Sequence, residues 1–139
     1  MLISKSFIIK GSRDKEILLD ISFTRNNFKK QIVIFSHGFK GFKDWGPFNE
    51  MAKSFANENL FFIKFNFSHN GTSVEDPYNF VDLESFGNNN FSLELDDLNY
   101  IINWIINNDS FTNEIDINKI NLLGHSRGGA ISILKAAED

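Results

Sequence analysis

The feature that most constrains the fold of this chain is a glycine-flanked turn, Gly-His-Ser-Arg-Gly-Gly, at residues 124–129. An apolar run at residues 120–123 precedes it and an alanine-rich amphipathic segment follows it, a pattern that predicts a strand, a sharp turn and a helix. Small residues at Gly124 and Gly128 allow the strand and the helix to pack closely around the turn. Ser126 is therefore expected to lie in a strained backbone conformation at the edge of a sheet.

The predicted turn places Ser126 where a nucleophile would lie. The free N–H of Arg127, at the positive end of the helix dipole, would stabilise negative charge on a carbonyl oxygen that the serine attacks. The alternative is a serine N-cap on an ordinary turn, whose hydroxyl bonds a free helix N–H. Glycines two positions before and two positions after Ser126 favour the nucleophile, because a cap does not require them.

Apolar segments before this turn predict alternating strands and helices. Residues 6–10 and 16–24 are β-rich and flank a polar turn, which predicts an antiparallel hairpin. Residues 32–35 form the continuous apolar run of a strand that is covered on both faces. A helix over residues 47–59 and a strand over residues 60–67 complete a parallel strand–helix–strand crossover.

The second half of the chain predicts a long connection, a helix, a strand and a final helix. Residues 68–90 are rich in Asn, Gly, Ser and acids, as in functional or mobile connections. Apolar spacing predicts a helix to about Asn108, a polar connection over residues 109–118 and a strand over residues 119–124. Three carboxylates fall in the first turn predicted for that helix: Glu94, Asp96 and Asp97. The apolar face predicted for the final helix comprises Ala130, Ile133, Leu134 and Ala137.

Composition indicates one globular domain, at residues 1–139, with an aromatic core. Hydrophobic residues make up 42% of the chain, and 16 of its residues are Phe. Since the net charge is -4 and the basic residues are scattered, we expect no nucleic-acid partner and no membrane partner. The chain has no cysteine, no signal-like N-terminus and no apolar run near the roughly 18 residues of a membrane helix. A cytoplasmic location is therefore expected.

With these segments in order, the sequence resembles the α/β-hydrolase family over nearly its whole length. An antiparallel start followed by parallel strands and crossover helices matches the N-terminal half of that α/β fold. His-Gly-Phe at residues 37–39 resembles the oxyanion loop after the family's third strand, and residues 124–129 match the G-x-S-x-G elbow after its fifth. The loop at residues 65–71 also resembles the one after the fourth strand. Residues 37–45 together with the elbow are most similar to small esterases of the acyl-esterase or cinnamoyl-esterase kind.

The resemblance implies roles for the matching residues. Ser126 takes the position of the nucleophile, and the backbone N–H groups of Phe39 and Arg127 take the oxyanion hole. Four further residues match structural positions of the two motifs: His37, Gly38, Gly124 and Gly128. We expect no cofactor and no metal, because the histidines lack spaced partners for a ligand set.

The triad acid and histidine of the family follow the nucleophile in sequence, and both are missing before the chain ends at Asp139. We therefore expect the N-terminal portion of a larger hydrolase, the alternative being a second polypeptide that supplies the rest, with turnover near background for these residues alone. His69 is the one plausible substitute base, against the alternative of a loop histidine that braces backbone, and His125 is expected to point away from Ser126. Three loop carboxylates either orient a base, bind substrate or are solvated: Asp76, Asp82 and Glu84.

Two interpretations also remain open for other side chains. The Arg127 guanidinium either binds anionic substrates or packs outward on its helix. Five aromatic residues either wall an acyl pocket or cover the core: Phe42, Trp45, Tyr78, Phe80 and Phe86.

The sequence thus predicts a serine hydrolase of carboxylic esters or related acyl substrates that requires a missing C-terminal half. The alternative is a non-catalytic hydrolase-like fragment that acts as a binding or interaction module. The strand at Ile120, Leu122 and Leu123 would be an apolar edge without charges, prolines or bulges, which predicts self-association through that edge.

Overall fold

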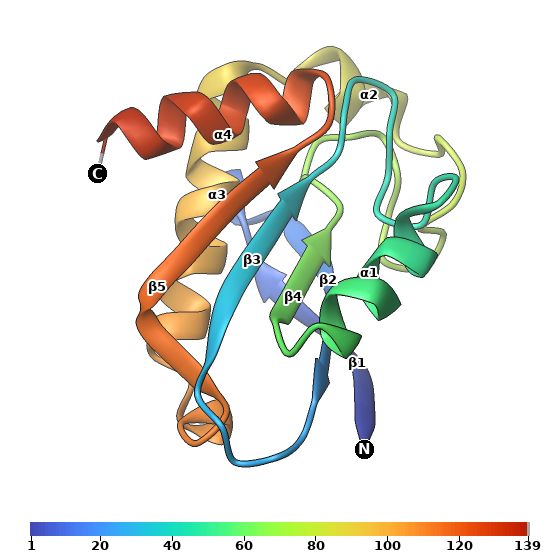
Figure 1. Cartoon of the computed structure of the whole chain (residues 1–139). Helices are drawn as coiled ribbons and strands as arrows, with labels where there is room; N and C mark the ends of the chain where they lie inside the picture. The colour runs from blue at the N-terminus through green and yellow to red at the C-terminus, as the bar shows by residue number, and fades with distance from the viewer. Residues whose placement is uncertain (139) are drawn as a thin grey trace.

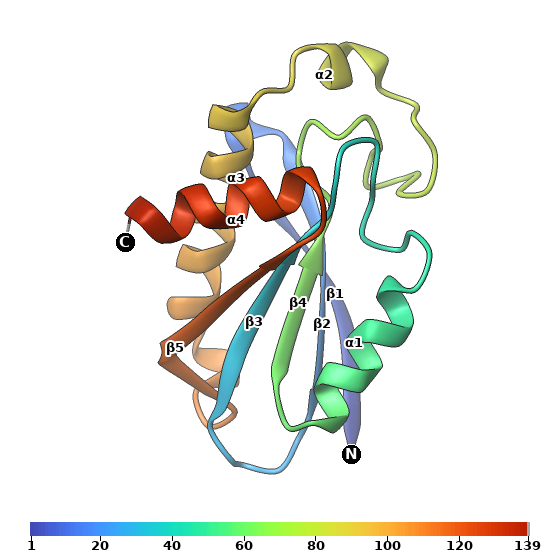
Figure 2. The ribbon, with the colours of Figure 1, turned by 45° about the horizontal axis from the view of Figure 1, so that its top comes forward.

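The computed structural model describes residues 1–138 and shows a five-stranded sheet with helices on both faces (Figures 1 and 2). The strands are β1 (Leu2–Lys10), β2 (Glu16–Thr24), β3 (Lys30–Ser36), β4 (Phe61–Phe65) and β5 (Ile115–Gly124). The helices are α1 (Phe48–Asn57), α2 (Leu83–Gly87), α3 (Phe91–Ile106) and α4 (Arg127–Glu138). Short 3₁₀ turns lie at Ser12–Asp14 and Asp109–Phe111.

The strands lie in the order β1-β2-β4-β3-β5. β1 and β2 form the predicted antiparallel hairpin, and β2 pairs antiparallel with β4. β3 is parallel to both β4 and β5, so the predicted crossover through α1 is confirmed. Ser36 at the end of β3 pairs with Gly124 at the end of β5. The segments that leave these two strands therefore start side by side at one end of the sheet.

Apolar side chains cover both faces of the sheet. On one face, Phe48 and Ala52 of α1 pack against Phe62 of β4. On the other face, α3 and α4 cover a larger cluster that contains the stacked rings of Phe23 and Phe61, whose centroids are 4.8 Å apart. The aromatic core predicted from composition is therefore present.

The predicted apolar face of α4 is wrong, because Ala130, Ile133, Leu134 and Ala137 all lie exposed. The buried positions are instead Gly128, Ile131, Ser132 and Lys135. These follow the i, i+3, i+4, i+7 spacing of one helix face that starts from Gly128. Since Gly128 packs on the backbone at the end of β3, that contact fixes the rotation of the helix.

Two strands begin four residues earlier than the sequence predicts. β1 begins at Leu2, and β5 begins at Ile115 within the predicted polar connection. The pairing of β3 with β5 shifts register between Lys30 and Ile32, which marks an irregularity in the first half of β5. This irregularity lies before Ile120, and the residues that were expected to form an edge without bulges, Ile120 to Leu123, pair in regular register.

The first turn of α3 contains Glu94 but not Asp97. Asn90 caps the helix by accepting a hydrogen bond from the Leu93 N–H, so the helix starts earlier than the apolar spacing suggested. Asp97 points inward and accepts hydrogen bonds from Ser12 and Ser68. Its carboxylate therefore serves to join loops and not to complement the helix dipole.

Candidate active site

The turn between β5 and α4 holds Ser126 at a positive φ of 57° with its side chain exposed. A Cβ on Gly124 would lie 2.3 Å from the carbonyl oxygen of Gly128, and one on Gly128 would lie 2.0 Å from that of Ser36. Side chains at either position would collide with backbone. The two glycines therefore permit both the tight turn and its contact with the end of β3.

The loop after β3 lies directly against this turn. A Cβ on Gly38 would lie 3.0 Å from both the His125 carbonyl oxygen and the Ser126 Cβ. Within residues 1–138, neither the N–H of Phe39 nor the N–H of Arg127 donates a hydrogen bond. The turn and the loop thus bring together an exposed hydroxyl and two N–H groups that have no acceptor.

A cavity of about 260 Å³ opens beside Ser126. Its lining residues are Gly38, Phe39, Lys40, Gly41, Trp45, Phe48, His125 and Ser126. The loop after β3 and the turn after β5 supply all of them but one, since Phe48 begins α1. The walls combine three aromatic rings with the backbone of two glycines.

The buried imidazole of His37 holds the loop in place. Its Nδ1 lies 2.8 Å from the Gly38 carbonyl oxygen, and its Nε2 lies 3.2 Å from the Phe67 nitrogen. Since a carbonyl only accepts and an amide N–H only donates, the proton must sit on Nδ1. Burial lowers the pKa of His37 to about 4, although the bond to Gly38 opposes this, so the ring is neutral at pH 7.

The other two histidines do not hydrogen-bond Ser126. The His125 ring packs against Trp45 and Phe48, with centroids 6.0 and 5.9 Å away. His69 Nδ1 lies 2.7 Å from Ser68 Oγ, which donates to the Asp97 carboxylate in turn. His69 also does not line the cavity beside Ser126. Burial lowers the pKa of His69, which favours its neutral form.

The Arg127 side chain is directed towards α3. Its Nε lies 2.5 Å from Glu94 Oε1, and its guanidinium lies 4.2 Å from the centre of the Phe91 ring. The pair is largely enclosed, since the Glu94 side chain is 4% exposed. The guanidinium is thus occupied by an ion pair and a cation–π contact, unlike either interpretation from the sequence.

The other loop residues of interest have local structural partners. Asp82 caps α2 and pairs with Lys15 at 2.6 Å, which lowers the pKa of Asp82 to about 2. Asp76 accepts from the Asn79 side chain, and Glu84 lies in the first turn of α2. Of the five candidate aromatic residues, Trp45 alone lines the cavity beside Ser126. Phe86 packs against Phe39, and Tyr78 packs against Phe42.

Four buried charged side chains form ion pairs in and beside the second half of the loop after β3. None of them was predicted from the sequence as a site residue. Lys43 contacts Asp20 at 2.8 Å and Asp44 at 2.7 Å, and Lys64 contacts the same two carboxylates at 2.8 Å each. We call Asp20, Lys43, Asp44 and Lys64 the ion ring. The available signal was Lys64, a lone charge in an otherwise apolar strand.

The hydrogen bonds in the ion ring stabilise its charged state. Burial raises the pKa of both carboxyls, but the bonds from Lys43 and Lys64 outweigh it and hold the pKa of Asp20 and Asp44 below the usual value. Burial likewise opposes the charge on Lys43, yet the two carboxylates raise its pKa. These bonds therefore favour the ionised forms of Asp20, Asp44 and Lys43.

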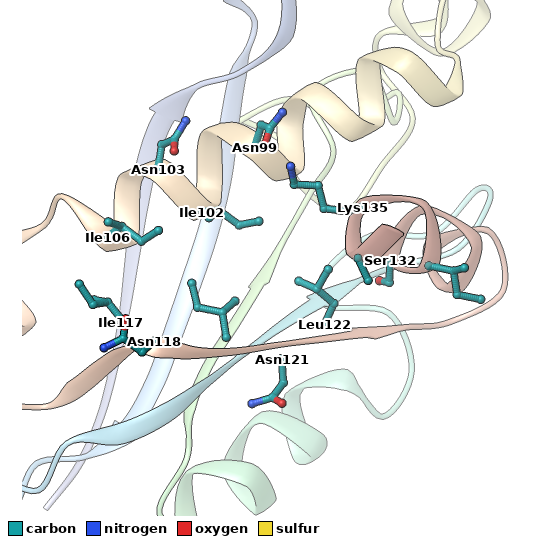
Figure 3. Close-up of a pocket in the computed structure, with 13 residues that line it drawn as sticks. Asn99, Ile102, Asn103, Ile106, Ile117, Asn118, Asn121, Leu122, Ser132 and Lys135 are labelled. Atoms are coloured by element: carbon teal, nitrogen blue, oxygen red, sulfur yellow. The ribbon is translucent and has the colours of Figure 1, made fainter. Parts of the chain in front are cut away.

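A larger cavity of about 810 Å³ lies away from Ser126, between α3, β5 and α4 (Figure 3). Ile102 and Ile106 of α3 lie on one side of it, and Ile117 and Leu122 of β5 lie on the other. It contains none of the residues predicted for the site. Among residues 1–138, no cluster of His, Asp and Glu could hold a metal ion, and no helix is long and apolar enough to cross a membrane.

Solved structures with low sequence identity share this fold. Esterase Est22 gives a TM-score of 0.75 at 15% identity, over 99% of this chain and 38% of that chain. A dienelactone hydrolase from Anabaena variabilis gives a TM-score of 0.72 at 17% identity, over 97% of this chain and 58% of that chain. An alpha-beta serine hydrolase homologue from Coxiella burnetii gives 0.67 at 21% identity, over 97% and 58%.

No protein-family model matches the sequence, and no curated protein matches it with significance. The chain spans 38% to 58% of the length of the three solved structures above. At sequence identities of 15% to 21%, this structural similarity shows the fold alone. Together with the strand order, it shows that this chain has the fold of the N-terminal half of an α/β hydrolase.

Proposed function

We propose that this chain carries the nucleophile and the oxyanion hole of a serine hydrolase that cleaves carboxylic esters or related acyl substrates. The Ser126 hydroxyl attacks the acyl carbonyl while a general base takes its proton, and the N–H groups of Phe39 and Arg127 bind the oxyanion. The acyl C–O bond then breaks, the alcohol leaves with that proton, and water releases the acyl group from the serine as a carboxylic acid. One observation carries the proposal: an exposed serine at positive φ lies in contact with Gly38, beside two N–H groups without acceptors.

The general base and its acid belong, in this proposal, to a further part of the full-length protein. Within residues 1–138, no imidazole or carboxylate hydrogen-bonds the Ser126 hydroxyl. General-base help is worth roughly 10²–10⁴-fold, so we expect these residues alone to turn over esters near background. Turnover by the isolated chain that His69→Ala abolishes would contradict this expectation.

An ester substrate agrees with the surroundings of Ser126. The cavity walls are aromatic at Phe39, Trp45 and Phe48, which suits an apolar acyl group. Two of the similar structures are named as an esterase and as a dienelactone hydrolase. A cytoplasmic location remains a prediction from the sequence.

Hydrolysis of short p-nitrophenyl esters by the full-length protein tests the proposal. We expect Ser126→Ala to lower kcat by at least about a thousandfold, because the attacking oxygen is lost. Ser132→Ala is the matched control, since Ser132 lies on the same helix and its hydroxyl has no hydrogen-bond partner within the described residues. Turnover that survives Ser126→Ala would refute the proposal.

A non-catalytic binding module is the second candidate. The observation that favours it is that no imidazole or carboxylate within residues 1–138 hydrogen-bonds the Ser126 hydroxyl. If the full-length protein hydrolyses no ester and binds no serine-directed probe, this candidate replaces the first.

A further inference from the structure

The ion ring joins the loop after β3 to the middle of the sheet. Lys43 and Asp44 belong to the loop, whereas Asp20 lies on β2 and Lys64 on β4. Asp20 and Lys64 are paired in the register of these strands and lie on the face that α1 covers, where Phe62 also packs. The loop between β3 and α1 runs over that same face (Figure 2).

Burial leaves this ring with one favourable arrangement. The four side chains are 3% to 14% exposed, so little water reaches a charge that loses its partner. Each charge has two opposite charges as neighbours, and a displacement of the loop would separate loop charges from sheet charges. Uncompensated buried charges are costly, which makes such a displacement unfavourable.

The anchored end of the loop is close to Phe39 along the chain. The Lys43 N–H donates to Asn66 Oδ1 at 2.6 Å, which adds a second attachment to the strand end. A tight turn follows from the 2.9 Å bond between the Gly41 N–H and the Gly38 carbonyl, with Phe39 and Lys40 as its central residues. Gly38 itself contacts Ser126, so Phe39 lies between two fixed points.

We infer that the ion ring positions the Phe39 N–H for the reaction at Ser126, an inference that rests on the function proposed above. Asp20, Lys43, Asp44 and Lys64 are thus positioning residues that act through the loop backbone. A loop released from the sheet would move the Phe39 N–H away from the developing oxyanion. Loss of one such donor lowers kcat by about 10²–10³-fold in a serine protease, and KM changes little.

The first test measures amide hydrogen exchange in the loop and does not depend on catalytic turnover. We expect Asp44→Asn to speed exchange of the Gly41 and Lys43 amide hydrogens, which donate to the Gly38 carbonyl and to Asn66 Oδ1, by about tenfold or more, because the loop loses a buried partner for Lys64. Glu114→Gln is the matched control: it neutralises one member of the buried Lys30–Glu114 pair near the start of β3, at the other end of the strand. That control leaves exchange of the Gly41 and Lys43 amide hydrogens unchanged.

The second test measures p-nitrophenyl ester hydrolysis by the full-length protein. We expect Asp44→Asn and Lys64→Met each to lower kcat by about tenfold or more with little change in KM, and the double variant to be no worse than the poorer single variant. Affinity for a phenylboronic acid, which mimics the tetrahedral intermediate, falls by the same factor. Asp44→Glu, which keeps the charge, restores part of kcat.

The two tests distinguish a failure of the proposed function from a failure of the inference about the ion ring. If wild-type protein shows no turnover that depends on Ser126, the proposed function fails. Hydrogen exchange then tests by itself whether the ion ring holds the loop in place. If wild-type turnover depends on Ser126 but Asp44→Asn keeps both the wild-type kcat and slow exchange, the inference fails. Equal loss of kcat in Asp44→Asn and Glu114→Gln also overturns it, since the effect would then be one of general stability.

Discussion

A Cβ on Gly128 would lie 2.0 Å from the carbonyl oxygen of Ser36, whereas one on Gly129 would lie 3.7 Å from its nearest neighbour, an ordinary contact. We expect Gly128→Ala to cost about 3 kcal/mol of unfolding free energy or more, because backbone must move. Gly129→Ala should be neutral or stabilising by up to about 1 kcal/mol, as alanine favours helix. Urea unfolding checks both, and equal costs would contradict the packing described for the turn.

His37 should make the unfolding free energy of the chain depend on pH. Its pKa in the folded chain, about 4, lies below the ordinary value of 6.5, so its contribution to stability is complete above pH 6.5 and is lost as the pH falls towards 4. We expect the gap in unfolding free energy between wild type and His37→Gln to narrow by up to about 3 kcal/mol between pH 7 and pH 4. A gap that stays constant would show that His37 titrates normally.

Between elements, the enclosed pair of Arg127 and Glu94 attaches the start of α4 to α3. Arg127→Met would leave the Glu94 carboxylate buried and unpaired, which should cost about 3 kcal/mol of unfolding free energy. The double variant Arg127→Met/Glu94→Gln should recover most of that loss, since no charge remains to be desolvated. Urea unfolding of both variants measures this, and strictly additive costs would exclude the coupling.

The strands were predictable because continuous apolar runs such as those of β3 and β4 leave few alternatives, and the turn at Ser126 was predictable from its glycines. The buried face of α4 was not, because backbone contact at Gly128 overrides the apolar stripe of Ile133 and Leu134. The ion ring also escaped prediction. Its four charges come from three segments, and only the fold shows that each has two buried partners.

At the scale of the whole molecule, β5 forms one edge of the sheet described for residues 1–138, with apolar side chains exposed near it. Unpaired apolar strand edges favour association between chains, so we expect the 139-residue chain to self-associate. Ile117→Lys, at a position of β5 that is 46% exposed, should shift it towards monomer. Ile8→Lys, at a 54% exposed position of β1 on the opposite edge, is the control and should not. If the unsubstituted chain sediments as a stable monomer, the expectation of self-association is contradicted.

Ser126 is the reactive group of the proposed function. The most direct measurement treats the full-length protein with a fluorophosphonate probe and maps the adduct by peptide mass spectrometry. We predict a single adduct on Ser126 that is absent in Ser126→Ala and retained in Ser132→Ala. A full-length protein that stays unlabelled, or that carries the adduct on another residue, would contradict the account.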